Sequence, residues 1–229
     1  MSKKVTIGIE VELASRLGRS TNQILEELGW MRTSDGTVHG RRDSTLSGNE
    51  FRSPKITVDL SQLSQEVSKI TEQFRKIVNS LSRSEENETA GIHFHINAKS
   101  SNGHAVKRWA YLFSKEFHDY LKSEYEKMAT TPLEKRRLGT NTYNQFEYDE
   151  TGTSRRRGIN YKSAFSKHGT IEFRFFPTTS NPRTFGKYLR LFLKAVKKFE
   201  FDQKPPVLKY EYKDKDKKIE EIDFSDVIY

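Results

Sequence analysis

The chain has 229 residues, of which 31% are charged and 34% hydrophobic, and it contains no cysteine. This length is enough to bury one sizeable core, and this balance is typical of a globular protein with a well-charged surface. The missing cysteines exclude disulfides, thiolate nucleophiles and Cys-ligated zinc. Any metal must therefore be held by His, Asp and Glu, which favours Mg²⁺ or Mn²⁺.

The net charge of +9 is compatible with a phosphate-rich partner such as ATP or nucleic acid, and equally with an ordinary solvated basic surface. The N-terminus, MSKKVTIGIEVEL, begins with lysines and turns apolar, but Glu10 and Glu12 interrupt the run. We therefore expect no signal peptide, and because no later segment approaches transmembrane length we expect no membrane contact and a cytoplasmic location.

The first third of the chain alternates strand and helix patterns. Apolar residues at every second position predict a half-buried strand, and apolar residues at helical spacing predict two helices, the second capped by Asp59. Gly-containing turn signals predict a hairpin ending at Pro54. The expected elements are a strand over 3–13, a helix over 21–30 with Ser20 or Thr21 as N-cap, a hairpin within 33–54 and a helix over 60–81.

The rest of the chain continues in the same manner. We expect a polar loop over 82–90, a strand over 91–97, a helix over 104–128, strands over 158–165 and 169–176, and a helix over 185–199. The polar, arginine-rich segment 130–157 shows no periodicity and reads as an active-site loop or lid. These elements predict an α+β fold, in which long amphipathic helices pack on one face of an antiparallel sheet and the other, concave face stays open. One domain over 1–203 is followed by a charged appendage over 204–229.

Strand alternation predicts which side chains lie on the open face. In GIHFHIN (91–97), the apolar residues at 92, 94 and 96 face the core, so His93 and His95 face the other way. In 169–176 the same argument places Thr170, Glu172, Arg174 and Phe176 on the open face. Side by side, the strands would bring together one acidic and imidazole cluster: Glu10, Glu12, Glu50, His93 and Glu172. Several ionised carboxylates need a compensating cation, so the cluster suits one or two divalent metals.

Each pair alone has an ordinary structural explanation. Glu-x-Glu on a strand is usually a solvated face, His-x-His is commonly packing or surface polarity, and Glu172 with Arg174 is most often a same-face ion pair. The conjunction of all three on one kind of face makes the metal hypothesis the stronger one.

Four stretches together resemble the amidoligase family of the glutamine synthetase-like carboxylate-amine ligase superfamily: GIEVE (8–12), DSTLSGNEFRSP (43–54), GIHFHIN (91–97) and GTIEFRFFPTTSNP (169–182). They occur in the order found in that family, and they span nearly the whole chain up to about residue 200. The resemblance implies a glutamine synthetase-like fold and an enzyme that makes amide bonds. ATP phosphorylates a carboxylate, and an amine then displaces phosphate from the acyl phosphate.

The resemblance also implies roles for the clustered residues. Glu10, His93 and Glu172 would hold a metal beneath the ATP phosphates, and Glu12 with Glu50 would hold a second metal nearer the carboxylate and amine substrates. His95 would contact nucleotide or substrate. Arg174 would neutralise the transferring phosphoryl group, since arginine matches phosphate with two parallel hydrogen bonds.

Further positive charge would come from the residues flanking GINYK: Arg155, Arg156, Arg157 and Lys162. The family carries a basic residue and an asparagine here, which correspond to Arg157 and Asn160, although a solvated arginine cluster explains any single arginine equally well. Asp43 would handle substrate or amine, with a structural Asp-Ser turn as the alternative. Glutamine synthetases use three acidic ligands at the second metal, so the third ligand here is Asp43, water or absent.

The carboxylate and amine substrates are not identified by the sequence; each could be an amino acid, a peptide, a protein or a modified nucleobase. Glutamine synthetases build active sites between subunits, which leaves room for a homo-oligomer. Two rival functions remain open at this stage: a two-metal nuclease or phosphodiesterase, and a basic non-enzymatic nucleic-acid-binding protein.

Overall fold

A computed structural model gives the structure of the chain and describes residues 3–38, 45–86, 88–97, 108, 111–112, 114–138, 158–160, 169–202, 208–210 and 220–222. Its centre is an eight-stranded sheet in which every paired strand is antiparallel. The strands are β1 (Lys4–Leu17), β2 (Met31–Ser34), β3 (Ser47–Arg52), β4 (Ile56–Asp59), β5 (Leu81–Glu85), β6 (Gly91–Asn97), β7 (Ile159–Asn160) and β8 (Thr170–Pro177).

The long strand β1 organises the sheet, whose order is β2-β3-β1-β6-β8-β7. Because β1 has 14 residues, it pairs with β4 and β3 in succession along one edge and with β6 and β5 along the other. Its side chains alternate between buried and partly exposed from Val5 to Leu13, as the sequence predicts.

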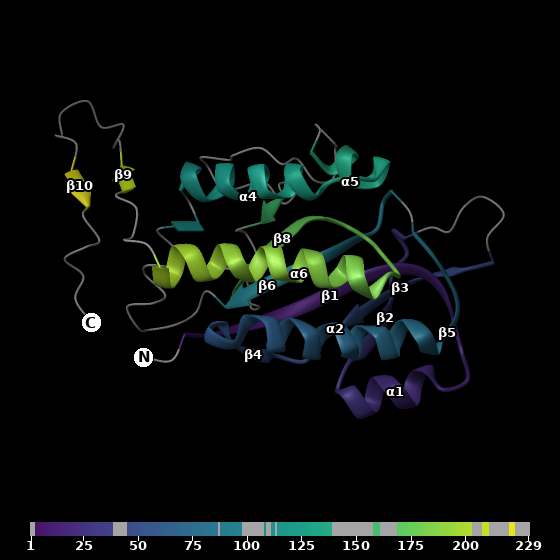
Figure 1. Ribbon diagram of the computed structural model, residues 1–229. Helices are drawn as coiled ribbons and strands as arrows, with labels where there is room; N and C mark the ends of the chain where they lie inside the picture. The colour runs from purple at the N-terminus through teal and green to yellow at the C-terminus, as the bar shows by residue number, and fades with distance from the viewer. Residues whose placement is uncertain are drawn as a thin grey trace.

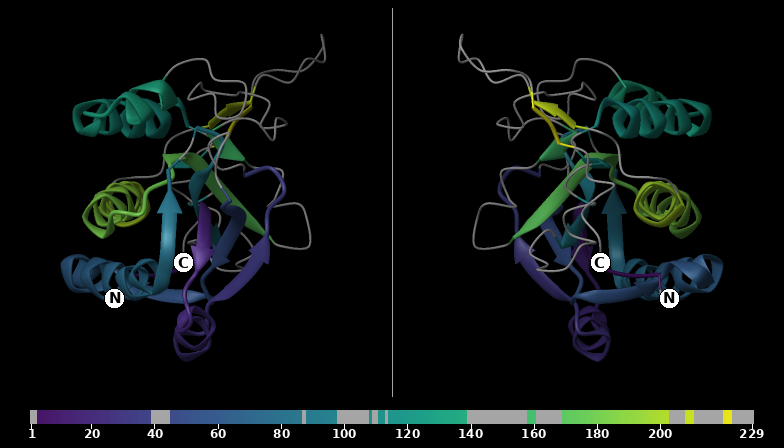
Figure 2. Two further views of the ribbon diagram at one scale, coloured as in Figure 1. Left: turned by 90° about the vertical axis from the view of Figure 1, so that its right-hand side faces the viewer. Right: turned by 90° about the vertical axis from the view of Figure 1, so that its left-hand side faces the viewer.

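The helices lie on one face of this sheet or at its edge. They are α1 (Thr21–Leu28), α2 (Leu63–Ser80), α4 (Lys115–Met128), α5 (Pro132–Arg137) and α6 (Pro182–Lys197), with single turns η1 (Leu60–Gln62) before α2 and η3 (Lys198–Asp202) after α6. In Figures 1 and 2, α1 lies below α2 at the edge, and the others form a layer on the face. Figure 1 shows α2, α6 and α4 side by side, and Figure 2 shows them stacked in one layer against the sheet. No helix of the described residues covers the opposite face, so the expected α+β architecture with an open antiparallel sheet is confirmed.

Aromatic residues hold the helical layer to the sheet. The ring of Phe94 on β6 lies 5.1 Å from that of Phe192 and 6.2 Å from that of Phe185, both on α6. Phe185 stacks in turn on Phe74 of α2 at 4.3 Å. Such pairs contribute about 0.5–1.5 kcal/mol each beyond the area they bury. They fix the apolar face of the strands against the helices and leave the polar face free.

Several boundaries differ from the sequence predictions. The segment predicted as a polar loop begins with β5, which forms because its backbone pairs with the second half of β1. The helix predicted over 104–128 does not run through Ser114, which is extended and caps α4 by accepting a hydrogen bond from the Phe117 N–H. Within the predicted lid lies α5, whose capping box joins Thr131 and Glu134.

One prediction about side-chain direction is wrong, because a β-bulge interrupts β8. Phe173 pairs with Phe94 and Phe176 pairs with Ile92, so Arg174 and Phe175 together lie opposite the single residue His93. The extra residue turns Phe176 to the core, where it is fully buried and its ring lies 5.1 Å from that of Phe94. Phe176 is therefore not on the open face.

The C-terminal segment differs from the rest of the chain. β9 (Leu208–Tyr210) and β10 (Glu220–Ile222) pair with each other in a two-stranded sheet apart from the main one. The predicted domain boundary at 203/204 lies outside the described residues. In the described part of the chain, no helix has the length and apolar character needed to span a bilayer.

Candidate metal centre

The register of five adjacent strands brings the predicted polar residues into one row across the open face. Glu10 of β1 lies opposite both Arg52 of β3 and His93 of β6, and Glu12 lies opposite Glu50. Farther along the row, Glu172 of β8 lies opposite both His95 of β6 and Asn160 of β7. Residues from nearly the whole length of the chain therefore meet on one surface.

Three residues in this row form a group of candidate metal ligands. Glu10, His95 and Glu172 each offer one ligand atom, and these three atoms lie within 4.8 Å of one another. His95 Nε2 is buried without a hydrogen-bond partner and lies 3.4 Å from Glu10 Oε2. The other ring nitrogen, Nδ1, is 3.2 Å from Thr170 Oγ1, a contact that orients the imidazole.

His93 lies among the same carboxylates at a deeper level. Its Nδ1 is 3.1 Å from Glu172 Oε1 and 3.5 Å from Glu10 Oε2, and its Nε2 is 3.8 Å from Glu12 Oε1. Burial lowers the pKa of His93, but Glu12, Glu10 and Glu172 outweigh burial and raise the pKa to about 10. A cluster that stabilises a proton this strongly is a cluster that attracts cations.

Burial and the neighbouring histidines shift the pKa values of these carboxylates in opposite directions. Burial raises the pKa of Glu172, yet the hydrogen bond and charge of His93 lower it to about 2. Glu10 is also buried, but the neighbouring imidazoles of His93 and His95 hold its pKa well below its usual range. For Glu12, burial prevails and raises the pKa. Glu10 and Glu172 are thus ionised at neutral pH.

Two neutral donors hold the far oxygens of these carboxylates. The Asn160 side-chain amide donates to Glu172 Oε2 at 2.7 Å, and the backbone N–H of Gly91 donates to Glu12 Oε2 at 2.7 Å. A Cβ at position 91 would lie 3.1 Å from His93 Nε2 and 3.2 Å from the Phe176 carbonyl oxygen, so only glycine fits without displacement. Each carboxylate keeps its other oxygen toward the cluster.

Two guanidiniums complete the centre. Arg52 Nε contacts Glu50 Oε1 and lies 3.6 Å from Glu10 Oε1, while Arg174 Nε lies 3.5 Å from Glu172 Oε1. Against the four glutamates, Arg52 and Arg174 leave two negative charges uncompensated when both histidines are neutral. One divalent cation would restore neutrality.

The sequence analysis missed three contributors. Arg52 is one of them: it follows Glu50 by two residues on β3, and this spacing is the signal that could have indicated an ion pair on one face of the strand. The Gly91 N–H and the Thr170 hydroxyl have no signal in isolation, because only the register of the sheet brings them beside Glu12 and His95.

The remaining predicted residues are Asp43, Arg155, Arg156, Arg157 and Lys162, which lie outside the described residues. Asn160 is described, but its amide binds a carboxylate rather than facing an open surface, and it is 3% exposed. It therefore positions Glu172.

Comparison with known proteins gives no family for this chain: neither the protein-family models searched nor the curated proteins include a match. The functional argument therefore depends on the residues and their geometry.

Proposed function

We propose that this chain is an ATP-dependent carboxylate-amine ligase of the amidoligase type, with a glutamine synthetase-like fold and a divalent metal, Mg²⁺ or Mn²⁺. The observation that carries the proposal is the convergence of Glu10, His95 and Glu172 within 4.8 Å on the uncovered face of an antiparallel sheet. The four sequence stretches that resemble the family include four of the strands that build this face, β1, β3, β6 and β8.

The donor set fits a hard divalent ion. Carboxylate oxygens and imidazole nitrogens are ligands that Mg²⁺ and Mn²⁺ accept, and the cluster contains no sulfur. The buried His95 Nε2 has no hydrogen-bond partner, a cost that a metal would remove. When His93 gives up its proton, the four glutamates exceed Arg52 and Arg174 by two negative charges, which one divalent ion would balance.

We assign Glu10, His95 and Glu172 to this ion, which differs from the sequence prediction by giving His95 a ligand role. His93 contacts both carboxylates of the group and, in the same proposal, either joins them as a ligand or holds them in place while protonated. Glu12 and Glu50 remain the candidates for a second ion, at the position where β1 and β3 pair. When bound, the ions would neutralise the phosphates and align the donor and acceptor oxygens.

The chain's own residues would perform the positioning. Arg174 lies at the bulge of β8 with its side chain 30% exposed, where it can reach an incoming phosphoryl group, and Glu172 Oε1 at 3.5 Å keeps it at the metal group. Asn160 fixes the second oxygen of Glu172. In the proposed reaction, the substrate carboxylate takes the γ-phosphoryl group of ATP, ADP leaves, and the amine then displaces phosphate to form the amide.

The direct test is ADP release by the full chain with Mg²⁺ or Mn²⁺ against a panel of carboxylate and amine pairs. We expect ADP and phosphate to form only when both substrates are present, and to be lost in Glu10→Gln and Glu172→Gln. The exposed helical variant Glu72→Gln is the matched control, since it removes one carboxylate far from the centre. Metal-dependent cleavage of DNA or RNA without ATP consumption would instead support a nuclease and overturn the proposal.

A further inference from the structure

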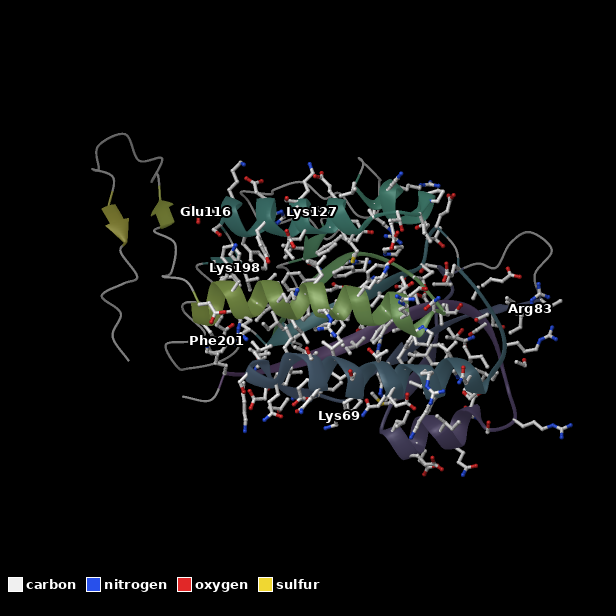
Figure 3. The ribbon with its side chains drawn as sticks, in the orientation of Figure 1. Lys69, Arg83, Glu116, Lys127, Lys198 and Phe201 are labelled. Carbon is white, nitrogen blue, oxygen red and sulfur yellow. The ribbon has the colours of Figure 1, made fainter. Side chains whose placement is uncertain are left out.

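The outward face of α6 carries an unbroken row of positive charge. Its cations recur every three or four residues along the helix and continue into the next turn: Arg183, Lys187, Arg190, Lys194, Lys197 and Lys198. The helix contains no Asp or Glu, and Arg183, Lys187 and Lys194 are exposed. We call this row the α6 stripe. Figures 1 and 3 look onto this face and show α6 along its middle, between α2 and α4.

The α6 stripe differs from the charged faces of the neighbouring helices. On α2, Arg75 Nη2 lies 2.6 Å from Glu72 Oε1, and on α4, Lys127 Nζ lies 2.5 Å from Glu124 Oε1. Within the described part of the chain, no ion pair joins a cation of the stripe to a carboxylate. Like charges three or four residues apart destabilise a helix, so the stripe reduces stability without compensation from its own fold.

The contacts that the stripe does make leave its charge available. Arg190 Nη1 donates to Ser64 Oγ at 3.2 Å, and Lys198 Nζ lies 4.0 Å from the centre of the Tyr120 ring. Neither partner is anionic. The stripe therefore contributes six positive charges to one face of a chain whose net charge is +9, which makes it a strong local attractor for a polyanion.

The dimensions of the stripe match the backbone of a nucleic-acid duplex. α6 has 16 residues, which at a rise of about 1.5 Å each gives a length of about 24 Å. One strand of a duplex presents a phosphate about every 3.4 Å along its axis, so the helix spans about seven phosphates. Because the backbone winds around the duplex axis, a straight row of cations laid along the duplex contacts the phosphates where a strand passes beneath it.

Other polyanionic partners fit this face less well. Among the described residues, the exposed large hydrophobic side chain is Met31, which lies on β2 and not in the helical layer. Where this face is described, no exposed aromatic side chain offers a platform for the bases of a single strand, and no exposed apolar side chain is available to insert into a lipid surface. These features favour a partner recognised through its phosphates alone.

We propose that the α6 stripe binds the phosphate backbone of duplex nucleic acid without reading its sequence. The helical layer lies on the side of the sheet opposite the metal centre, so the two sites can be occupied independently. The proposal does not depend on the ligase activity and is tested without it.

The test measures binding of the full chain to a fluorescent DNA duplex longer than the stripe, by anisotropy, across a salt titration starting at about 50 mM. The variant is Lys187→Glu/Lys194→Glu, and the control is Lys69→Glu/Lys76→Glu on α2. Both pairs are exposed lysines seven residues apart on one helix, and both change the net charge equally. We expect the α6 variant to lose at least tenfold in affinity and about two units of salt slope, and the α2 control to change less than threefold.

The outcomes separate the alternatives. Equal losses in both variants would show that only net charge acts, and would overturn the proposal. Absence of duplex binding by the wild type at the lowest salt, with sedimentation on phosphatidylserine vesicles instead, would assign the stripe to a membrane surface and also overturn it. Circular dichroism checks that each variant is folded. If the charge-reversal variant does not fold, the neutral variant Lys187→Gln/Lys194→Gln replaces it. We expect the neutral variant to lose affinity for the duplex as well, but by a smaller factor.

Discussion

Two clusters of buried charge in this molecule are built in different ways. In the first, the Glu200 carboxylate of η3 accepts hydrogen bonds from Arg108 Nε at 2.8 Å, from a second guanidinium nitrogen of Arg108, and from the Tyr111 hydroxyl at 3.0 Å. In the second, the candidate metal centre, the shortest contact between His93 and its carboxylates is 3.1 Å and the others reach 3.8 Å. The first cluster balances one carboxylate with one guanidinium, whereas the second holds more carboxylates than guanidiniums.

The difference distinguishes charged groups that stabilise the fold from carboxylates whose oxygens stay free to bind a cation. A buried ion pair is tolerated when geometry and hydrogen bonds satisfy both partners, and Arg108 with Glu200 meets that condition. The Arg108 guanidinium also donates to the Asn97 carbonyl at the end of β6, so the pair ties η3 to the sheet. The carboxylates of the metal centre are held by Asn160 and Gly91 on one oxygen only, and this arrangement leaves the other oxygens for a cation.

Breaking the structural pair is the change with the largest expected effect. Arg108→Met leaves Glu200 buried and unpaired, which costs about 3–5 kcal/mol in the free energy of unfolding, measured by urea denaturation. The double variant Arg108→Met/Glu200→Leu removes both charges and is expected to recover most of that loss. A double variant as unstable as the single one would mean that packing, and not charge, is what Arg108 supplies.

A second change tests how closely the metal centre is packed. Gly91→Ala places a Cβ about 3 Å from the His93 ring and from the Phe176 carbonyl oxygen, and the backbone atom cannot move aside cheaply. We expect a loss of about 1–3 kcal/mol in unfolding free energy, typical of overpacking. The control is Gly36→Ala, because no atom lies within 4 Å of the added Cβ there. Equal stability of the two variants would contradict the close packing around His93.

A pH titration sharpens the same comparison. The pKa of His93 rises from 6.5 in the unfolded chain to about 10 in the folded protein, so its stabilisation is fully present below pH 6.5 and is lost as the pH rises toward 10. In the presence of a chelator, we expect wild-type unfolding free energy to fall between pH 6.5 and 9.5 more steeply than that of His93→Gln, by up to about 1.4 kcal/mol per pH unit. Parallel curves would show that His93 is not protonated among the carboxylates.

The smallest effect on stability is expected at the exposed edge of the metal centre. Arg52 is 44% exposed, and its ion pairs with Glu50 and Glu10 contribute about 0–1 kcal/mol. Arg52→Gln should change unfolding free energy by no more than that, and it should tighten metal binding because a competing cation is gone. Weaker metal binding, measured by calorimetry, would show instead that Arg52 is needed to place the two carboxylates.

Much of the sheet and of the metal centre could be predicted from the sequence, because both depend on alternation within strands. The periods of two in 3–13 and 91–97 correctly separate the core face from the face that carries Glu10, His93 and His95. Alternation gave the wrong direction for Phe176, because a β-bulge adds a residue to β8 and the local sequence pattern does not indicate a bulge. It failed also at β5, where pairing with β1 overrides a polar composition.

Which residues of the cluster meet most closely could not be predicted. Alternation places His93 and His95 on the same face, but the register of β6 against β8 puts His95 opposite Glu172 and within the group of candidate ligands. The Gly91 N–H and the Asn160 amide act through hydrogen bonds between strands far apart in the chain, and such contacts leave no trace in either strand alone.

The most direct test of the central claim is a calorimetric titration of the metal-free protein with Mn²⁺. The account predicts saturable binding by the wild type, loss of that binding in each of Glu10→Gln, His95→Gln and Glu172→Gln, and wild-type affinity in Glu72→Gln. Binding that survives in all three variants, or a wild type that binds no Mn²⁺, would contradict the claim that these side chains share one ion.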